Sequence, residues 1–265
     1  MCSCFMRYKE LWFEQTMVQH KSDISLFNMR SLKSSEKEAD DIYYKFMKRN
    51  KKLIIFDWDG TIMDSISFIS QCLVNSFEKL NFESLSEERA KSIIGLGLVD
   101  ALEALTPGMS QENRSDLLKT YKEFFHANVE GSVQPYSFVH EGLELLSKQN
   151  HFLAVATGKS RAGLEKDFDR SGLRKYFHAS KTIDDCRSKP DPQMIHDLMN
   201  EFNVLPENTV MVGDTTYDMD MAINAGVRRV ASAYGAHSEE SLLLRNPLFM
   251  GNSFEKILHY LAYKL

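Results

Sequence analysis

The stretch KKLIIFDWDGTIMDS, residues 51–65, decides the fold and raises a question of chemistry. Its apolar run, residues 52–56, has the length and β-branched content of a strand that is buried on both faces. Asp57 and Asp59 follow this run directly. Two carboxylates this close repel each other, and burial beside an apolar strand increases the cost. A bound cation, a shared proton or solvation in a turn would each offset that cost.

The same strand pattern returns at residues 152–157, 209–214 and 228–234. Amphipathic helical patterns separate these later runs and end at glycines such as Gly172 and Gly226. Strands that alternate with helices of this length indicate βαβ units. The sequence therefore predicts an α/β fold, with a Rossmann-like parallel sheet and helices on both of its faces.

Residues 57–151, between the first two strand candidates, are too many for a single βαβ crossover. Most of this segment has a helical pattern, which predicts an inserted helical subdomain, the cap, at residues 64–134. The α/β core then comprises residues 51–63 and 135–265. Within residues 1–50, the stretch that precedes the core in the sequence is rich in polar and charged residues. We expect residues 1–50 to be an extension that the core does not require.

Composition narrows the class of protein further. The 265 residues carry a formal net charge of -5, which argues against a nucleic-acid partner. No apolar run approaches the roughly 18 residues that a membrane-spanning helix needs. The four cysteines have neither a disulfide framework nor zinc-site spacing. Reduced thiols in a cytoplasmic protein are the expectation.

Ligands of open parallel sheets bind beyond the carboxyl ends of the strands, so the residues after each apolar run belong together. They are Asp57, Asp59, Thr157, Gly158, Lys159, Ser160, Asp214 and Asp218, with Lys189 at the entry to the next helix. Carboxylates suit Mg²⁺, while a lysine and a glycine turn suit an anion. A cation site beside an anion site indicates phosphate chemistry, in which one Asp attacks phosphorus and its neighbour moves the proton of the leaving oxygen.

Each element has an ordinary structural explanation when it stands alone. Asp-x-Asp is usually a solvated turn, and GDTTYD is typical of a helix N-cap. The segment ATGKS ends like a phosphate-binding P-loop, but Leu153 stands where that motif needs its first glycine. The order of the elements and their shared position at strand ends favour one common site.

Four segments together resemble the motifs of the haloacid dehalogenase superfamily of phosphatases. They are DWDGT, ATGKS, KPDP and GDTTYDMDMA, at residues 57–61, 156–160, 189–192 and 213–222. The resemblance extends over about residues 50–260. It is greatest to the phosphoglycolate-phosphatase-like branch, where a helical cap is inserted after the first motif.

The resemblance implies roles for the four residues expected to act on phosphate. Asp57 would be the nucleophile that forms an aspartyl-phosphate, and Asp59 the general acid and base. Thr157 and Lys189 would hold the oxygens of the transferring phosphoryl group. These roles suit a reaction in which charge spreads over the phosphoryl oxygens.

The resemblance also implies a Mg²⁺ site. Asp214 would bind the ion together with the Asp57 side chain and the main-chain carbonyl of Asp59, while Asp218 would support the site. Asp59 further separates the phosphatases from the dehalogenases of this superfamily. Displacement of a halide needs no proton on the leaving group, whereas an alkoxide does, so we expect a phosphatase.

Substrate preference is expected to come from the cap, because the core site contacts only phosphate and metal. Gly95 and Gly97 lie in a cap segment that, by resemblance, returns towards the active site, although an ordinary helix break would also explain them. Gly158 stands where phosphoglycolate phosphatases commonly have Asn. Lys159 would either reach the part of the substrate away from the phosphate or close the site.

The expected function is a Mg²⁺-dependent phosphomonoester hydrolase for a small metabolite, such as a phosphoglycolate or sugar-phosphate type of ester. A phosphosugar mutase or a pyrophosphatase on the same scaffold is the enzymatic alternative. A non-catalytic binding or regulatory module is the alternative from another class. The expected partner is a small phosphate ester, with no nucleic acid and no membrane, and the oligomeric state stays open.

Overall fold

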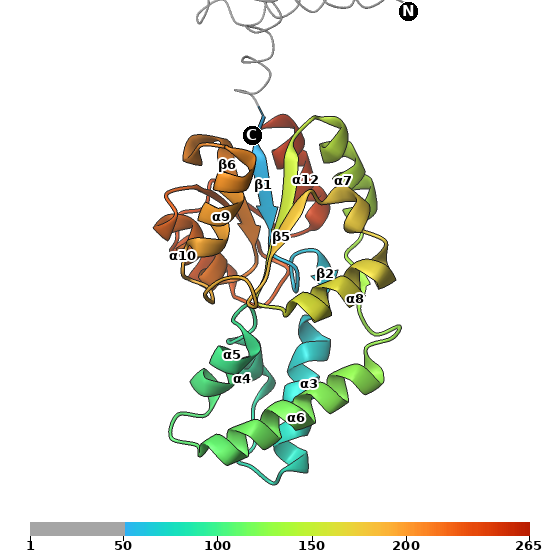
Figure 1. The fold of residues 1–265 in the computed structure, drawn as a ribbon, viewed down its shortest axis with the longest axis vertical. Coiled ribbons are helices and arrows are strands. Elements are labelled where there is room, and N and C mark those ends of the chain that lie inside the picture. Colours follow the sequence, from blue (N-terminus) through green and yellow to red (C-terminus); the bar gives the residue numbers. More distant parts are fainter. Residues whose placement is uncertain (1–50) are drawn as a thin grey trace, which may run out of the picture. The chain divides into compact units, whose positions relative to one another are not determined.

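The computed structural model describes residues 51–265. The expectation for residues 1–50 lies outside the described residues. Within the described part, the α/β core and the helices of the cap are seen in Figure 1.

A six-stranded parallel sheet forms the centre of the core, which confirms the predicted fold class. Its order is β5-β4-β1-β6-β7-β8. The strands are β1 (Leu53–Phe56), β4 (Phe152–Ala156), β5 (Ala179–Lys181), β6 (Thr209–Gly213), β7 (Arg228–Ser232) and β8 (Phe249–Gly251). The four strands expected from the apolar runs are present, and each ends one or two residues earlier than predicted, except β1. The polar residues expected at the site therefore begin directly where strand pairing ends.

Helices cover both faces of the sheet because successive side chains of a strand point to opposite sides. Ile54 and Phe56 of β1 belong to one apolar cluster, with residues of α7 (Val139–Lys148), α8 (Arg161–Ser171) and α12 (Phe254–Tyr263). Leu53 and Ile55 belong to the other cluster, with residues of α9 (Gln193–Phe202) and α10 (Thr216–Asn224). The short helix α11 (Glu239–Leu243) lies between β7 and β8 in the chain.

The register of the central strands brings their carboxyl ends level. Phe56 of β1 is aligned with Val155 of β4 and with Val212 of β6. One residue further, the main-chain N–H of Asp57 still donates to the carbonyl of Val212 at 2.8 Å. The residues that follow β1, β4 and β6 therefore meet at one edge of the sheet, as the strand-end argument expects.

Four helices occupy the predicted cap segment. They are α3 (Ile66–Lys79), α4 (Glu87–Lys91), α5 (Leu98–Leu105) and α6 (Gln111–Asn128). Their buried apolar side chains form a cluster separate from those of the core. Two short antiparallel strands, β2 (Met63–Asp64) and β3 (Gln134–Pro135), pair where the chain leaves and re-enters the core. The cap as a separate domain, with its boundaries at residues 64 and 134, stays a prediction.

The strands that the sequence did not reveal are short. β5 and β8 have three residues each, and β2 and β3 have two. All three residues of β5 are only partly buried, so it has no continuous apolar run. These strands are held by pairing with their neighbours in the sheet, a tertiary effect that hydrophobic periodicity does not register.

Candidate active site

The expected site residues gather at the carboxyl edge of the sheet. Asp57 follows β1, Thr157 follows β4 and Asp214 follows β6, and each side chain is buried. Lys189 reaches the same place from the loop before α9 and is also buried. The structure thus brings together residues that are up to 157 positions apart in the chain, from Asp57 to Asp214.

Lys189 lies between two carboxylates. Its Nζ is 2.6 Å from Oδ1 of Asp57 and 2.6 Å from Oδ1 of Asp218. Burial lowers the pKa of Lys189, but the charges of Asp218 and Asp57 outweigh burial and raise the pKa above its ordinary value. Lys189 is therefore a permanent cation within the cluster, and it neutralises part of the carboxylate charge.

The cluster nevertheless holds more negative charge than Lys189 can balance. Burial, together with the charges of Asp218 and Asp214, raises the pKa of Asp57 well above its usual value, although Lys189 acts in the opposite direction. One carboxylate oxygen of each of Asp57, Asp214 and Asp218 lies within 4.8 Å of the others. The second oxygen of Asp57, Oδ2, is buried and has no hydrogen-bond partner among the described residues. This three-carboxylate arrangement fits a hard divalent cation such as Mg²⁺.

Two hydrogen bonds and the close approach of two glycines hold the carboxylate of Asp214 in place. Its Oδ1 accepts from the hydroxyl of Thr61 at 2.8 Å, and its Oδ2 accepts from the main-chain N–H of Ala236 at 2.8 Å. A Cβ added at Gly60 or Gly235 would lie 2.2 Å from Oδ2 of Asp214, so glycine is needed at both positions. Burial, and then the charge of Asp218, raises the pKa of Asp214 to about 7.

Asp218 is oriented by the first turn of α10. Thr215 and Asp218 form a reciprocal capping box, in which the main-chain N–H of Asp218 donates to the Thr215 hydroxyl and the main-chain N–H of Thr215 donates to Oδ2 of Asp218. The Thr215 hydroxyl also donates to Oδ2 of Asp218 at 2.7 Å. This bond points the other oxygen, Oδ1, towards Lys189. The N-cap pattern seen in GDTTYD and the place of Asp218 in the buried charge cluster are therefore compatible, because Oδ2 serves the cap and Oδ1 faces Lys189.

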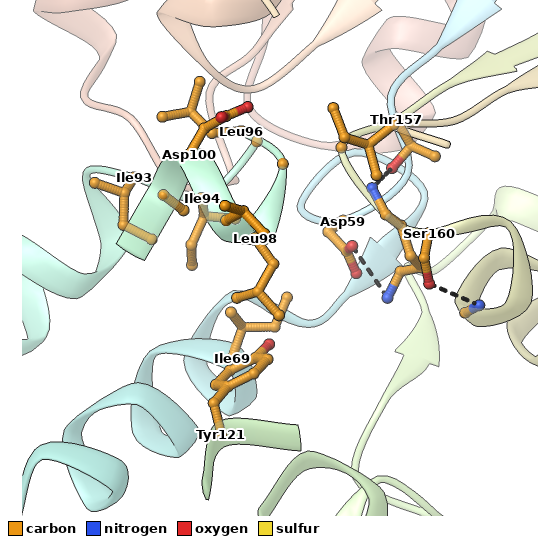
Figure 2. Close-up of a pocket in the computed structure, with 18 of the residues that line it drawn as sticks. Asp59, Ile69, Ile93, Ile94, Leu96, Leu98, Asp100, Tyr121, Thr157 and Ser160 are labelled. Carbon is orange, nitrogen blue, oxygen red and sulfur yellow. Dashed lines mark hydrogen bonds and ion pairs between the residues drawn. The ribbon is translucent and has the colours of Figure 1, made fainter. Parts of the chain in front are cut away.

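Asp59 occupies a different environment from Asp57. Its Oδ1 accepts from the hydroxyl of Ser65 at 2.8 Å, and its Oδ2 is 3.1 Å from Nζ of Lys159. Its side chain is not part of the three-carboxylate group. In Figure 2, Asp59 and Thr157 face the cap residues Leu98 and Tyr121 across a pocket. The main-chain carbonyl of Asp59 as a metal ligand stays a prediction.

A buried carboxylate that the sequence did not single out supports Lys159. Asp167 of α8 is only 2% exposed, and its Oδ2 is 3.0 Å from Nζ of Lys159. The same oxygen accepts from the indole N–H of Trp58 at 2.9 Å, and Arg170 pairs with Oδ1. Burial lowers the pKa of Lys159, but Asp59 and Asp167 together raise it. Asp167 looks like any polar helix residue in the sequence, because no motif marks its contacts with Lys159 and with the distant Trp58.

Gly158 is in direct contact with the cap. A Cβ at this position would lie 2.4 Å from the carbonyl oxygen of Leu96 and 2.8 Å from that of Gly95. Gly95 has a φ of +104°, and the main-chain N–H of Gly97 donates to the Ser188 hydroxyl at 3.0 Å. A Cβ at Gly97 would lie 2.7 Å from Cγ1 of Ile183, and the positive φ of Gly95 favours glycine, so both cap glycines lie where a side chain is poorly accommodated. An Asn at position 158 does not fit this arrangement.

His237, to which the sequence assigned no role, forms a second contact between core and cap. Its Nδ1 accepts from the main-chain N–H of Thr216 at 3.0 Å, and its Nε2 is 3.2 Å from the carbonyl oxygen of Ser92. The hydroxyl of Tyr217 also donates to Ser92 O, at 3.0 Å. Burial lowers the pKa of His237, which favours the neutral ring that these two bonds require.

Comparisons with known proteins agree with this geometry. The family described as haloacid dehalogenase-like hydrolase matches residues 54–232, so this chain belongs to that family. It is a hydrolase whose relatives are named phosphatases and pyrophosphatases. The resemblance inferred from the four motifs is confirmed.

Three relatives illustrate the similarity. Pyrophosphatase PpaX of Halalkalibacterium halodurans is 28% identical over 80% of this chain and 97% of its own length. Phosphoglycolate phosphatase of Vibrio parahaemolyticus is 28% identical over 80% of this chain and 96% of its own length. The crystal structure of a predicted phosphoglycolate phosphatase from Haemophilus somnus has a TM-score of 0.73 at 23% identity, over 80% of this chain and 98% of that one. This last likeness shows the shared fold.

None of the helices within residues 51–265 combines the length and the apolar character that crossing a bilayer demands.

Proposed function

We propose that this hydrolase is a Mg²⁺-dependent phosphomonoesterase that acts on a small molecule through an aspartyl-phosphate on Asp57. The observation that carries the proposal is the separation of the two motif carboxylates. Asp57 is buried with Lys189, Asp214 and Asp218, whereas Asp59 is held over the pocket by Ser65 and Lys159. Two carboxylates in different environments can take different roles in one reaction.

In the first half of the reaction, the Asp57 carboxylate attacks phosphorus and the bond from phosphorus to the alcohol oxygen breaks. Asp59 gives its proton to that oxygen as it leaves. Lys189 and Thr157, both buried at the carboxyl edge of the sheet, bind the phosphoryl oxygens and keep phosphorus in line with Asp57.

In the second half, a water molecule attacks the phosphorus of the aspartyl-phosphate. Asp59, now ionised, takes the proton of that water, and the bond to Asp57 breaks to release phosphate. Asp57, Asp214 and Asp218 would hold Mg²⁺, which supplies positive charge beside the transferring phosphoryl group. Lys189 contributes a further fixed positive charge that does not depend on the ion.

The test of this proposal is phosphate release from a panel of phosphomonoesters and pyrophosphate, with and without Mg²⁺, for the wild type and for Asp57→Asn. The amide is nearly isosteric with the carboxylate but is a poor nucleophile, so turnover should disappear while the melting temperature is kept. Substantial activity in Asp57→Asn would rule out Asp57 as the nucleophile.

Asp59→Asn tests the acid role in the same assay. An alkoxide leaving group needs a proton more than an aryloxide does, so this variant should lose more activity on alkyl than on aryl phosphates. Equal losses on both classes would count against Asp59 as the acid.

A pyrophosphatase is the second candidate, and it is favoured by the relatives named PpaX. The phosphosugar mutase is the other enzymatic alternative. A mutase would accumulate a long-lived phosphoenzyme, whereas a hydrolase would not. The pyrophosphate arm of the panel and a measurement of phosphoenzyme lifetime distinguish these two from the proposed phosphomonoesterase.

A further inference from the structure

A cavity of about 460 Å³ opens beside Asp57 and Asp59 and extends into the cap. This volume lies within the roughly 300–1,000 Å³ that is typical of pockets for small organic ligands. Asp57, Asp59 and Thr157, which are expected to act on phosphate, form only a small part of the cavity lining. The remaining space must accept the alcohol part of the ester, so its walls report on the substrate.

The cap wall of the cavity is largely apolar, although Asp100, Lys122 and His126 also line it. Its apolar side chains, from the cap helices and from the segment before α5, include Ile69, Leu73, Ile93, Leu98, Leu118 and Phe125. Figure 2 shows Ile69, Ile93 and Leu98 around the space opposite Asp59. Tyr121 adds a hydroxyl for which the described residues provide no hydrogen-bond partner, and burial raises its pKa, so it stays neutral.

No cation that is both buried and unpaired is among the described residues that line the cavity. Lys159 is already paired with Asp59 and Asp167. Lys122 and His126 line the cavity from exposed positions, and burial together with nearby cations lowers the pKa of His126. No arginine is among the described residues that line the cavity. A carboxylate or second phosphate placed against the apolar side chains of the cap, away from the exposed Lys122, would lose its hydration without gaining a partner.

We infer that the preferred substrate is a phosphate monoester of a neutral, apolar alcohol, whose alkyl or aryl group fills the cap side of the cavity. This inference rests on the proposed phosphomonoesterase function. This substrate preference would distinguish the protein from enzymes whose substrates carry a negative charge on the leaving group. Phosphoglycolate and pyrophosphate would both put a negative charge against the apolar wall.

The test is a series of n-alkyl phosphates of increasing length, measured for kcat/KM beside phosphoglycolate and pyrophosphate. Each methylene buried against the wall should raise kcat/KM by up to roughly fourfold, until the cavity is full. The longer alkyl phosphates should exceed both anionic compounds by more than tenfold. A flat series, or a preference for either anionic compound, would overturn the inference.

Leu98→Lys provides a variant that is expected to fold, because Leu98 is only half-buried. It places a cation on the wall, and it should reduce the dependence on chain length and raise the relative kcat/KM for phosphoglycolate. Leu205→Lys is the matched control, because Leu205 is 60% exposed and does not line the cavity. An unchanged substrate order in Leu98→Lys would contradict the inference.

Binding measurements separate failure of this inference from failure of the proposed function. Titration calorimetry with Asp57→Asn and the same compounds gives an affinity order that does not require turnover. Affinity that rises with chain length supports the apolar site even if the wild type releases no phosphate, in which case only the proposed function fails. Tighter binding of phosphoglycolate or pyrophosphate overturns the apolar site, whatever the rate of phosphate release.

Discussion

Gly158→Ala tests whether the contact between cap and core is needed for activity. The new Cβ would lie 2.4 Å from the carbonyl oxygen of Leu96. An ordinary contact is about 1 Å longer, and the opposing atom is backbone, so the cap segment must move away. Overpacking of this kind costs about 1–3 kcal/mol. The cost falls on the arrangement in which the cap covers the site, so kcat/KM should fall by roughly 5- to 150-fold.

The assay is steady-state phosphate release with Mg²⁺, together with thermal unfolding. The melting temperature of Gly158→Ala should stay close to that of the wild type, because the cap segment can yield without disturbing the sheet. Gly172→Ala is the control, since Gly172 ends α8 with a φ of +66° and its Cβ would meet nothing within 4 Å. This control should lose about 1 kcal/mol of stability and keep its kcat/KM. A kcat/KM for Gly158→Ala equal to that of the wild type would refute the reasoning.

Two further predictions concern the buried charges. Lys189→Met leaves Asp57 and Asp218 without their cation, so the free energy of unfolding should fall by about 3–5 kcal/mol, and Mg²⁺ should restore part of it. An unchanged free energy of unfolding in a urea titration would contradict this arrangement of Lys189 between two carboxylates. Without metal, the raised pKa of Asp214, about 7, means that its contribution to stability is complete below the pKa of the unfolded chain and is lost as pH rises through 7. Mg²⁺ must displace that proton, so the rise in melting temperature caused by Mg²⁺ should be larger at pH 8 than at pH 6. Equal rises at both pH values would contradict this assignment, and Asp214→Asn should abolish the difference.

The predicted residues of the core site came from a simple rule. A parallel sheet brings the carboxyl ends of its strands to one edge, so residues that directly follow apolar runs can be placed together without coordinates. Asp57, Thr157 and Asp214 obey this rule, and β1, β4 and β6 place them as expected. Lys189 follows no strand; it was placed with the others from its position at the entry to a helix, and the resemblance then implied its role.

The residues that the sequence did not reveal act through side-chain contacts that short motifs do not mark. Asp167 matters because Lys159, from the preceding loop, and Trp58, which is distant in the chain, converge on it. Ser65 holds Asp59 through a turn that begins beyond the first strand. No pattern of hydrophobicity or spacing in a single chain marks such pairs.

The sequence by itself determined the central strands of the sheet, the inserted helices and the chemistry of the residues at the strand ends. These features depend on periodicity and on short motifs that act locally. Only the tertiary structure decided the character of the cavity. Ile69, Leu98 and Phe125 appear in the sequence as ordinary core positions of amphipathic helices. They become the wall of a binding site because the cap folds back until Leu96 contacts Gly158, and that approach depends on packing between segments distant in the chain.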